Sequence, residues 1–138
     1  MKFTLIVCTY MRPKPVDDLL ASIQKQTVYP DEILIIDGSR NLETQKILEQ
    51  RSYPKLNYYL VDDAQRGLTK QRNYGIARVQ ESSEIVFFLD DDTLLEPNYF
   101  EEIIDAFQSD SAVVGVGGIA INENFWKKNS GGVEFYAS

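Results

Sequence analysis

Three consecutive aspartates, Asp90 to Asp92, follow the apolar run at residues 85–89. The run is short and rich in β-branched and aromatic residues, which is typical of a buried strand. Carboxylates held this close together repel one another unless a cation lies between them. A divalent metal that also holds a phosphate-bearing ligand would explain the cluster. The alternative is a solvated acidic turn that caps the next helix.

The ends of the other expected strands bear on this choice, because they also carry polar residues. The side chains that follow the first three strands are Thr9, Tyr10, Arg12, Asp37, Ser39, Asp62, Asp63 and Arg66. In an open α/β sheet the ligand lies outside the carboxyl ends of the strands. Each residue alone is ordinary for a loop. Together they suit a nucleotide, since an aromatic ring can stack on a base, carboxylates and arginine can contact its edge, and carboxylates with a metal can hold ribose and diphosphate.

Strand-like and helix-like segments alternate along the chain. Strands are expected at residues 3–8, 33–36, 56–61, 85–89 and 112–116, and helices at 15–26, 42–50, 68–79 and from 97 onward. This alternation predicts βαβ units, and therefore an α/β fold with an open, mostly parallel sheet flanked by helices. The near-continuous apolar strands indicate a sheet that is covered on both faces.

Two of the helices carry more specific expectations. In the first, Asp17 and Asp18 are expected in the first turn, where the helix dipole favours acidic side chains. In the third, Leu68, Ile76 and Val79 are expected on one side of the helix, as its apolar stripe. Arg72 lies four residues from Leu68 and four from Ile76, so its guanidinium should have a designated partner.

Size, charge and composition exclude several classes of protein. The 138 residues are enough for one domain, residues 1–138. The net charge of -7 argues against a nucleic-acid polymer as partner. Histidine is absent and Cys8 is the one cysteine, which excludes Ser-His and Cys-His nucleophiles and an internal disulfide. No run approaches the ~20 apolar residues of a membrane span, and we expect a cytoplasmic protein, free or peripheral at the inner face of the membrane.

Five segments, in order along the chain, resemble motifs of the family 2 nucleotide-sugar glycosyltransferases of the GT-A fold. They are residues 6–12 (IVCTYMR), 22–27 (SIQKQT), 32–39 (EILIIDGS), 67–75 (GLTKQRNYG) and 88–93 (FLDDDT). The resemblance implies the Rossmann-like, nucleotide-binding half of that fold. It also implies a single family 2-like domain that ends before the acceptor-binding half.

The resemblance implies a nucleotide-sugar site. Tyr10 would stack near the base beside Thr9, Asp37 would bind the base imide, and Arg72 would reach a base carbonyl. The full donor-binding set is Thr9, Tyr10, Arg12, Asp37, Ser39, Arg72, Asp90 and Asp91.

The resemblance also implies a metal site with a DxD-type motif. Asp90 and Asp91 would contact ribose and metal, and Asp92 would be the main protein ligand of Mn²⁺ or Mg²⁺. The catalytic base is not assigned, because Glu123 and Glu134 are candidates by position alone.

Two residues depart from the family pattern. Gly38 stands where the family often has a second aspartate, so base recognition would rest on one carboxylate. Met11 replaces the usual asparagine of the first loop.

The function implied is metal-dependent transfer of a sugar from a nucleoside-diphosphate sugar to an acceptor hydroxyl. A UDP-sugar donor and a saccharide or lipid-linked acceptor are expected, in the synthesis of cell-surface polysaccharide or glycoconjugates. One alternative is a catalytically silent module that binds nucleotide or protein. Another is a nucleotidyltransferase, which residues 9–14 disfavour because they contain no glycine. Apolar surface left by a missing half would favour self-association.

Overall fold

The structure is a computed structural model that describes residues 1–118 and 134–137. Its elements, in chain order, are β1 (Phe3–Thr9), α1 (Pro13–Ile23), β2 (Glu32–Asp37), α2 (Glu43–Glu49), β3 (Leu56–Leu60), α3 (Leu68–Ile76), β4 (Ile85–Asp90), α4 (Tyr99–Ser109), β5 (Val113–Gly117) and β6 (Glu134–Ala137). The described residues divide into two compact units. Residues 1–25 and 29–95 form the first, and residues 26–28 with the segment from residue 96 form the second.

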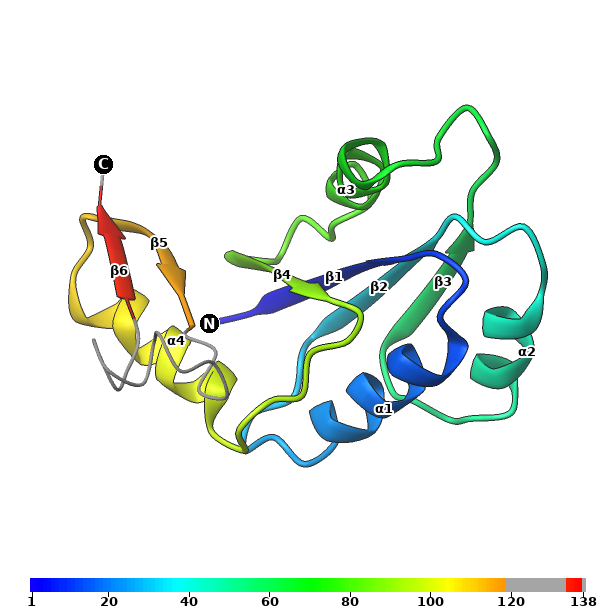
Figure 1. The fold of residues 1–138 in the computed structure, drawn as a ribbon. Helices are drawn as coiled ribbons and strands as arrows, with labels where there is room; N and C mark the ends of the chain where they lie inside the picture. Colours follow the sequence, from blue (N-terminus) through cyan, green and yellow to red (C-terminus); the bar gives the residue numbers. More distant parts are fainter. Residues whose placement is uncertain (119–133, 138) are drawn as a thin grey trace, which may run out of the picture. The chain divides into compact units, whose positions relative to one another are not determined.

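The first unit is built on a parallel sheet of four strands in the order β3-β2-β1-β4. Helices α1 and α2 cover one face of this sheet, and α3 lies on the other (Figure 1). The prediction of an α/β fold with a mostly parallel sheet flanked by helices is confirmed. Because the strands are parallel, their carboxyl ends meet at one edge, where Thr9 of β1 is paired with Asp37 of β2.

The core of this unit is formed by the two central strands and α1. Every residue of β2 is buried, and so is nearly all of β1. Helix α1 contributes the side chains at i, i+3, i+4 and i+7, namely Val16, Leu19, Leu20 and Ile23. Each fully buried aliphatic side chain stabilises the fold by about 1.5–3 kcal/mol relative to an exposed one. The apolar periodicity of the sequence therefore fixes how α1 sits on the sheet.

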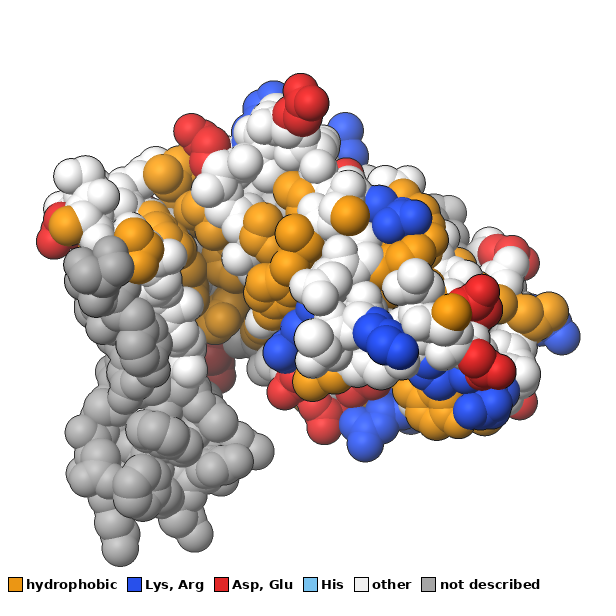
Figure 2. Space-filling model, turned by 90° about the horizontal axis from the view of Figure 1, so that it is seen from above, with side chains coloured by type: hydrophobic (Ala, Val, Ile, Leu, Met, Phe, Trp, Pro, Cys, Tyr) orange, Lys and Arg blue, Asp and Glu red, His pale blue; other side chains and the backbone are white. Residues whose placement is uncertain are grey.

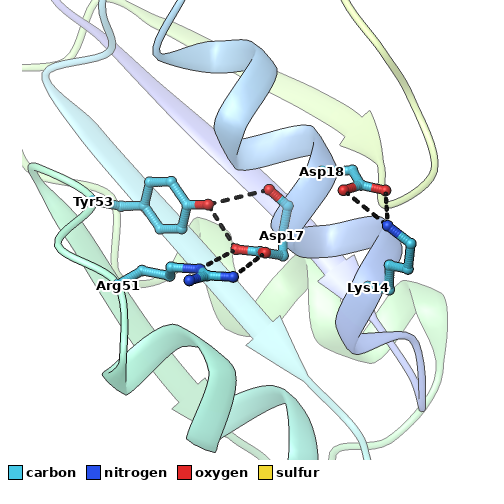
Figure 3. Close-up of polar contacts among 5 residues, drawn as sticks. All are labelled: Lys14, Asp17, Asp18, Arg51 and Tyr53. Atoms are coloured by element: carbon cyan, nitrogen blue, oxygen red, sulfur yellow. Dashed lines mark hydrogen bonds and ion pairs between the residues drawn. The ribbon is translucent and has the colours of Figure 1, made fainter.

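Helix α1 begins at Pro13, two residues earlier than expected. The fixed φ of proline and its missing N–H suit the first turn of a helix. Neither Asp17 nor Asp18 therefore lies in the first turn, and that expectation was wrong. Asp17 instead accepts hydrogen bonds from Arg51 (Nη2 to Oδ2, 3.0 Å) and from the Tyr53 hydroxyl (2.6 Å), as Figure 3 shows. These contacts tie α1 to the segment that follows α2.

Helix α3 ends at Ile76, and of the expected stripe only Val79, just beyond the helix, is partly buried against the core. Leu68 and Ile76 are 54% and 50% exposed, and the buried residues of the helix are Gln71 and Gly75. A Cβ added at Gly75 would lie 2.9 Å from Cγ2 of Ile6, so the absence of a side chain lets the helix approach β1 closely. Close backbone approach, rather than apolar periodicity, decides which face of α3 meets the sheet.

The face of the sheet beside α3 carries exposed hydrophobic side chains (Figure 2). Val86 and Phe88 of β4 are 39% and 43% exposed there, in addition to Leu68 and Ile76 of α3. The guanidinium carbon of Arg72 lies 5.6 Å from the centre of the Phe88 ring, a cation–π distance. The partner expected for Arg72 is thus an aromatic ring.

The second unit contains α4 and a two-stranded antiparallel sheet of β5 and β6. Gln26 anchors the start of α4, because its side-chain amide donates to the carbonyl of Glu96 and accepts from the backbone N–H of Phe100. The fifth strand that the sequence predicts is present, but it pairs with β6, which the sequence pattern did not predict. Within the residues described, no helix is long and apolar enough to cross a membrane.

Candidate functional site

A cavity of about 420 Å³ opens at the carboxyl ends of the parallel strands in the first unit. Its walls come from the end of β1, the loop after it, the start of α3 and the loop after β4. The lining residues are Cys8, Thr9, Tyr10, Arg12, Arg66, Gly67, Leu68, Gln71 and Asp91. Its volume is within the range of small-molecule sites, roughly 300–1,000 Å³.

Thr9 joins three parts of the cavity wall. Its Oγ1 donates a hydrogen bond of 2.8 Å to Oδ2 of Asp91. Its carbonyl accepts from the N–H of Gly38 (2.9 Å) and from the side-chain amide of Gln71 (3.1 Å). Because Thr9 is buried, these bonds fix the end of β1 against β2, α3 and the acidic loop.

Arg12 faces two of the three aspartates. Its Nη1 lies 3.2 Å from Oδ1 of Asp91 and 3.4 Å from Oδ2 of Asp92. The side chain of Asp91 is 12% exposed and that of Asp92 is 63% exposed, while Asp90 is exposed as well. Two carboxylates therefore converge on a single cationic group at the cavity rim.

This pair of carboxylates suits a divalent cation whose other ligands are phosphate and water oxygens. In the described part of the chain, no three His, Cys, Asp or Glu side chains come together as a metal-binding group. Mg²⁺ sites, however, often use one or two carboxylates together with substrate phosphates and water. Asp91 and Asp92 supply such a pair, because both carboxylates face the guanidinium of Arg12.

Asp37 lies behind the cavity wall and is fully buried. Its Oδ1 accepts from the N–H (2.8 Å) and the hydroxyl (2.5 Å) of Ser39, and its Oδ2 accepts from the hydroxyl of Tyr58 (2.5 Å). Burial, followed by the hydrogen bond to Asp37, raises the pKa of Tyr58 well above its ordinary value. Tyr58 therefore stays protonated, and the buried carboxylate keeps three donors.

The loop after β1 contains a residue in the left-handed region. Met11 has φ 55°, which costs roughly 1–2 kcal/mol for a residue that is neither glycine nor asparagine. The N–H of Met11 donates to Oγ of Ser39 at 2.8 Å. The neighbours of Met11 are Tyr10 and Arg12, which both line the cavity.

A second cationic side chain, that of Arg66, also lines the cavity. Arg66 donates from Nε to the carbonyl of Gly38 (2.6 Å) and pairs with Asp63. Arg40 lies 3.5 Å from the same Asp63 carboxylate and donates from Nε to the Tyr10 hydroxyl (3.2 Å). The cavity is thus lined by two arginines and one aspartate, in a chain whose net charge is -7.

Cys8 also lines the cavity, and its thiol is half-buried. Burial raises the pKa of this thiol to about 11, and the nearby charge of Arg72 opposes the rise. The thiol is therefore neutral near pH 7 and behaves as a small apolar group.

The structure brings four predicted site residues to the cavity wall, namely Thr9, Tyr10, Arg12 and Asp91. The other predicted residues lie outside its lining, and these are Asp37, Ser39, Arg72, Asp90 and Asp92. Five lining residues are absent from the predicted donor-binding set, namely Cys8, Arg66, Gly67, Leu68 and Gln71. Arg66 was among the polar residues noted after the third strand, whereas Gln71 was missed. The spacing of Gln71 and Gly75, one helical turn apart, is the signal that could have marked the buried face of α3. Of the candidate bases, Glu134 lies in β6 and Glu123 lies outside the described residues.

Residues 4–136 match the family model for glycosyl transferase family 2. The chain belongs to this family. The resemblance of the five sequence motifs is confirmed, and with it the assignment of the chain to the N-terminal part of a family 2 transferase.

This family 2 chain has relatives and structural neighbours with known names. It is 26% identical to a glucosyl-dolichyl phosphate glucuronosyltransferase of Haloferax volcanii, over 88% of this chain and 39% of that protein. The structure of Staphylococcus aureus TarS 1-349 in complex with UDP-GlcNAc aligns at a TM-score of 0.64 with 25% identity, over 79% of this chain and 32% of TarS.

A mannosyltransferase from Pyrobaculum calidifontis, in complex with GDP-Man and Mn²⁺, aligns at a TM-score of 0.69 with 24% identity. That alignment covers 83% of this chain and 34% of the mannosyltransferase. These neighbours confirm the GT-A fold. The family 2 chain spans less than half the length of the curated relatives it matches.

Proposed function

We propose that this chain is the donor-binding part of a glycosyltransferase that moves a sugar from a nucleoside-diphosphate sugar to an acceptor hydroxyl. The observation that carries the proposal is the cavity at the carboxyl ends of the sheet, with Arg12 and Arg66 facing it from different loops. An anionic ligand is favoured by two guanidinium groups, and a diphosphate offers oxygens to both. Membership of family 2 supports sugar transfer as the reaction.

Each lining residue has a proposed role in binding the donor. Tyr10 offers an exposed ring on which a base can stack, and Arg40 holds its hydroxyl in place. Arg66, the second arginine of the cavity wall, would contact the edge of a base or a phosphate. Arg12 screens Asp91, so that a ligand with negative charge can approach the acidic loop.

The proposed cofactor is Mn²⁺ or Mg²⁺, held by Asp91 and Asp92, with Asp90 beside them for ribose or metal. When bound, the cation would neutralise charge on the departing diphosphate as a Lewis acid. This chain's own contribution is to place two carboxylates at one point, with Asp91 fixed by Thr9. The Mn²⁺ complex of the Pyrobaculum neighbour supports the choice of ion.

The proposed donor is a UDP-sugar, and the proposed acceptor is a saccharide or a lipid-linked sugar. The UDP-GlcNAc complex of TarS supports the donor, and the dolichyl phosphate in the name of the Haloferax relative supports a lipid-linked acceptor. A lipid-linked acceptor would bring the protein to the inner face of the membrane, where it would act as a peripheral protein in glycoconjugate synthesis.

Thermal unfolding in the presence of nucleotides tests the donor site. UDP, GDP, dTDP and CMP are compared, each with and without Mn²⁺, on the wild-type chain, Asp92→Asn and Asp105→Asn. Asp92 is exposed, so its amide should fold normally, and Asp105 is an exposed control on α4 with the same change in charge. A ligand at ~100 times its Kd should stabilise the chain by about 2.7 kcal/mol.

A Mn²⁺-dependent shift with one nucleotide, lost in Asp92→Asn and kept in Asp105→Asn, is the expected result. It would identify the base at the same time. If no nucleotide stabilises the wild-type chain under any condition, the donor site is absent, and the catalytically silent interaction module becomes the better description.

Self-association is a separate proposal, based on the apolar face beside α3. Leu68, Ile76, Val86 and Phe88 are all at least 39% exposed. Burial of such a face in a dimer would remove apolar surface from water. Light scattering should show a mass above 15.8 kDa that falls toward it in Phe88→Glu. A wild-type chain that is monomeric at all concentrations would refute the proposal.

A further inference from the structure

The hydrogen bonds of Asp37 are directed into the protein. An ionised carboxylate has two oxygens with about four acceptor positions. Three of these positions are filled by the N–H and hydroxyl of Ser39 and by the hydroxyl of Tyr58. The residue is 0% exposed and does not line the cavity. A ligand could contact this carboxylate only by displacing a buried partner.

Ser39 connects Asp37 to the loop after β1 through hydrogen bonds. Its hydroxyl has one hydrogen, which it donates to Asp37, and it accepts from the N–H of Met11 through a lone pair (2.8 Å). One residue earlier, the N–H of Gly38 donates to the carbonyl of Thr9. Two successive residues after β2, Gly38 and Ser39, therefore bind the last residue of β1 and the turn that follows it.

Met11 needs such support because of its backbone conformation. Its φ of 55° is unfavourable for a side chain of this type, whereas asparagine and glycine adopt it readily. Relaxation of Met11 to negative φ would change the direction of the chain between Tyr10 and Arg12. Both of these residues line the cavity, so their placement depends on the Met11 turn.

We propose that Asp37 is a positioning residue, which acts through Ser39 to hold the Met11 turn and thereby sets Tyr10 and Arg12 at the cavity wall. Tyr58 belongs to the same group of hydrogen-bonded residues, because its hydroxyl is the third donor to the Asp37 carboxylate. The consequence for nucleotide binding rests on the proposed function, but the consequence for the turn does not. The competing interpretation is that Asp37 contacts the base directly.

The experiment compares five variants, Ser39→Ala, Asp37→Asn, Tyr58→Phe, Met11→Asn and the double variant Met11→Asn/Ser39→Ala. Ser82→Ala is the matched control, because Ser82 is exposed in the loop before β4. The first measurement is hydrogen exchange of the Met11 amide by NMR, without ligand. The second is the Kd of UDP with Mn²⁺ by calorimetry, or of whichever nucleotide stabilises the wild-type chain.

The proposal predicts that Ser39→Ala accelerates exchange of the Met11 amide and weakens nucleotide binding by about two- to tenfold, the usual effect of one hydrogen bond. Tyr58→Phe should weaken binding in the same direction. Met11→Asn should restore most of the affinity that Ser39→Ala loses, because asparagine holds the turn without help. Ser82→Ala should change neither measurement.

Two results would overturn the proposal. One is unchanged Met11 exchange and unchanged affinity in Ser39→Ala, with binding abolished in Asp37→Asn, which would make Asp37 a direct ligand. The other is a loss of affinity in Ser39→Ala that Met11→Asn does not restore. If the wild-type chain binds no nucleotide, the proposed function fails, while the exchange of the Met11 amide still decides whether Ser39 holds the turn.

Discussion

Oγ1 of Thr9 lies 2.8 Å from Oδ2 of Asp91, so the last residue of β1 holds the acid that follows β4. The other oxygen of the same carboxylate faces Arg12. Asp91 is therefore oriented from two sides, one neutral and one cationic. This explains why it is the most buried of the acids that Arg12 contacts and the one that reaches the cavity wall.

Replacement of Thr9 by valine should weaken both the fold and the site. Valine keeps the shape of threonine but leaves Asp91 without a buried donor, which typically costs about 1–3 kcal/mol. Chemical denaturation should show a lower midpoint with an unchanged slope. Thr69→Val, at an exposed position of α3, is the control. Equal stability of the two variants would mean that the Thr9 hydroxyl contributes nothing.

Gly38→Ala should disturb two lining side chains at once. The added Cβ would lie 2.8 Å from Oε1 of Gln71 and 3.1 Å from Cγ of Arg66. Overpacking of this kind costs roughly 1–3 kcal/mol, and nucleotide affinity should fall as well. The clash with Gln71 can be isolated in a double-mutant cycle with Gln71→Ala. If the two changes are additive in the free energy of unfolding, the side chain of Gln71 does not limit residue 38.

The thiol of Cys8 should react slowly with iodoacetamide near neutral pH. Its pKa of about 11 means that the reactive thiolate forms only in strongly alkaline solution. The rate should therefore rise tenfold per pH unit from pH 7 to pH 10. Arg72→Ala should slow the reaction further, because Arg72 lowers this pKa. A rate that levels off near pH 8.5 would show an ordinary, solvated thiol instead.

The contact between Asp17 and Arg51 should make stability depend on pH. The hydrogen bond from Arg51 is the main cause that holds the pKa of Asp17 below its ordinary value of 3.8. A carboxyl group whose pKa is lower in the folded state stabilises the fold at pH values above its pKa in the unfolded state. This stabilisation is lost as the pH falls through its pKa in the folded state. The difference in unfolding free energy between the wild type and Asp17→Asn should thus be constant near pH 7 and shrink below about pH 4. A difference that does not shrink as the pH is lowered through the acidic range would contradict this origin.

Much of the fold could be predicted, because in the central strands and α1 the periodicity of apolar residues in the sequence matches the positions that are buried. In β1, β2 and α1, apolar side chains occupy most of the buried positions, and the polar exceptions are Thr4, Thr9, Glu32 and Asp37. Helix α3 was predicted as a helix, but the side that it turns toward the sheet could not be predicted in this way. The residues that it buries are an amide and a glycine, Gln71 and Gly75, with Tyr74 partly buried beside them, whereas Leu68 and Ile76 are exposed.

The site could be located from the sequence, but the direction of its side chains could not. Parallel strands bring their carboxyl ends together, so Thr9, Tyr10, Arg12 and Asp91 meet as expected. Whether a carboxylate faces a ligand or the protein depends on donors that come from other strands. Asp37 meets Tyr58 of β3 through the sheet register, 21 residues along the chain, and no local pattern marks that pair.

The parallel order β3-β2-β1-β4 also affects how the chain reaches its folded state. Parallel neighbours cannot be joined by a tight turn, so each pairing must wait for a crossover to form. The bond between Thr9 and Asp91 spans 82 residues, which places it among the slowest contacts to close. During synthesis from the N-terminus, β1, β2 and β3 can assemble before β4 exists. The cavity is complete only when β4 has joined the sheet, because Asp91 follows that strand, and a nucleotide would bind only from then on.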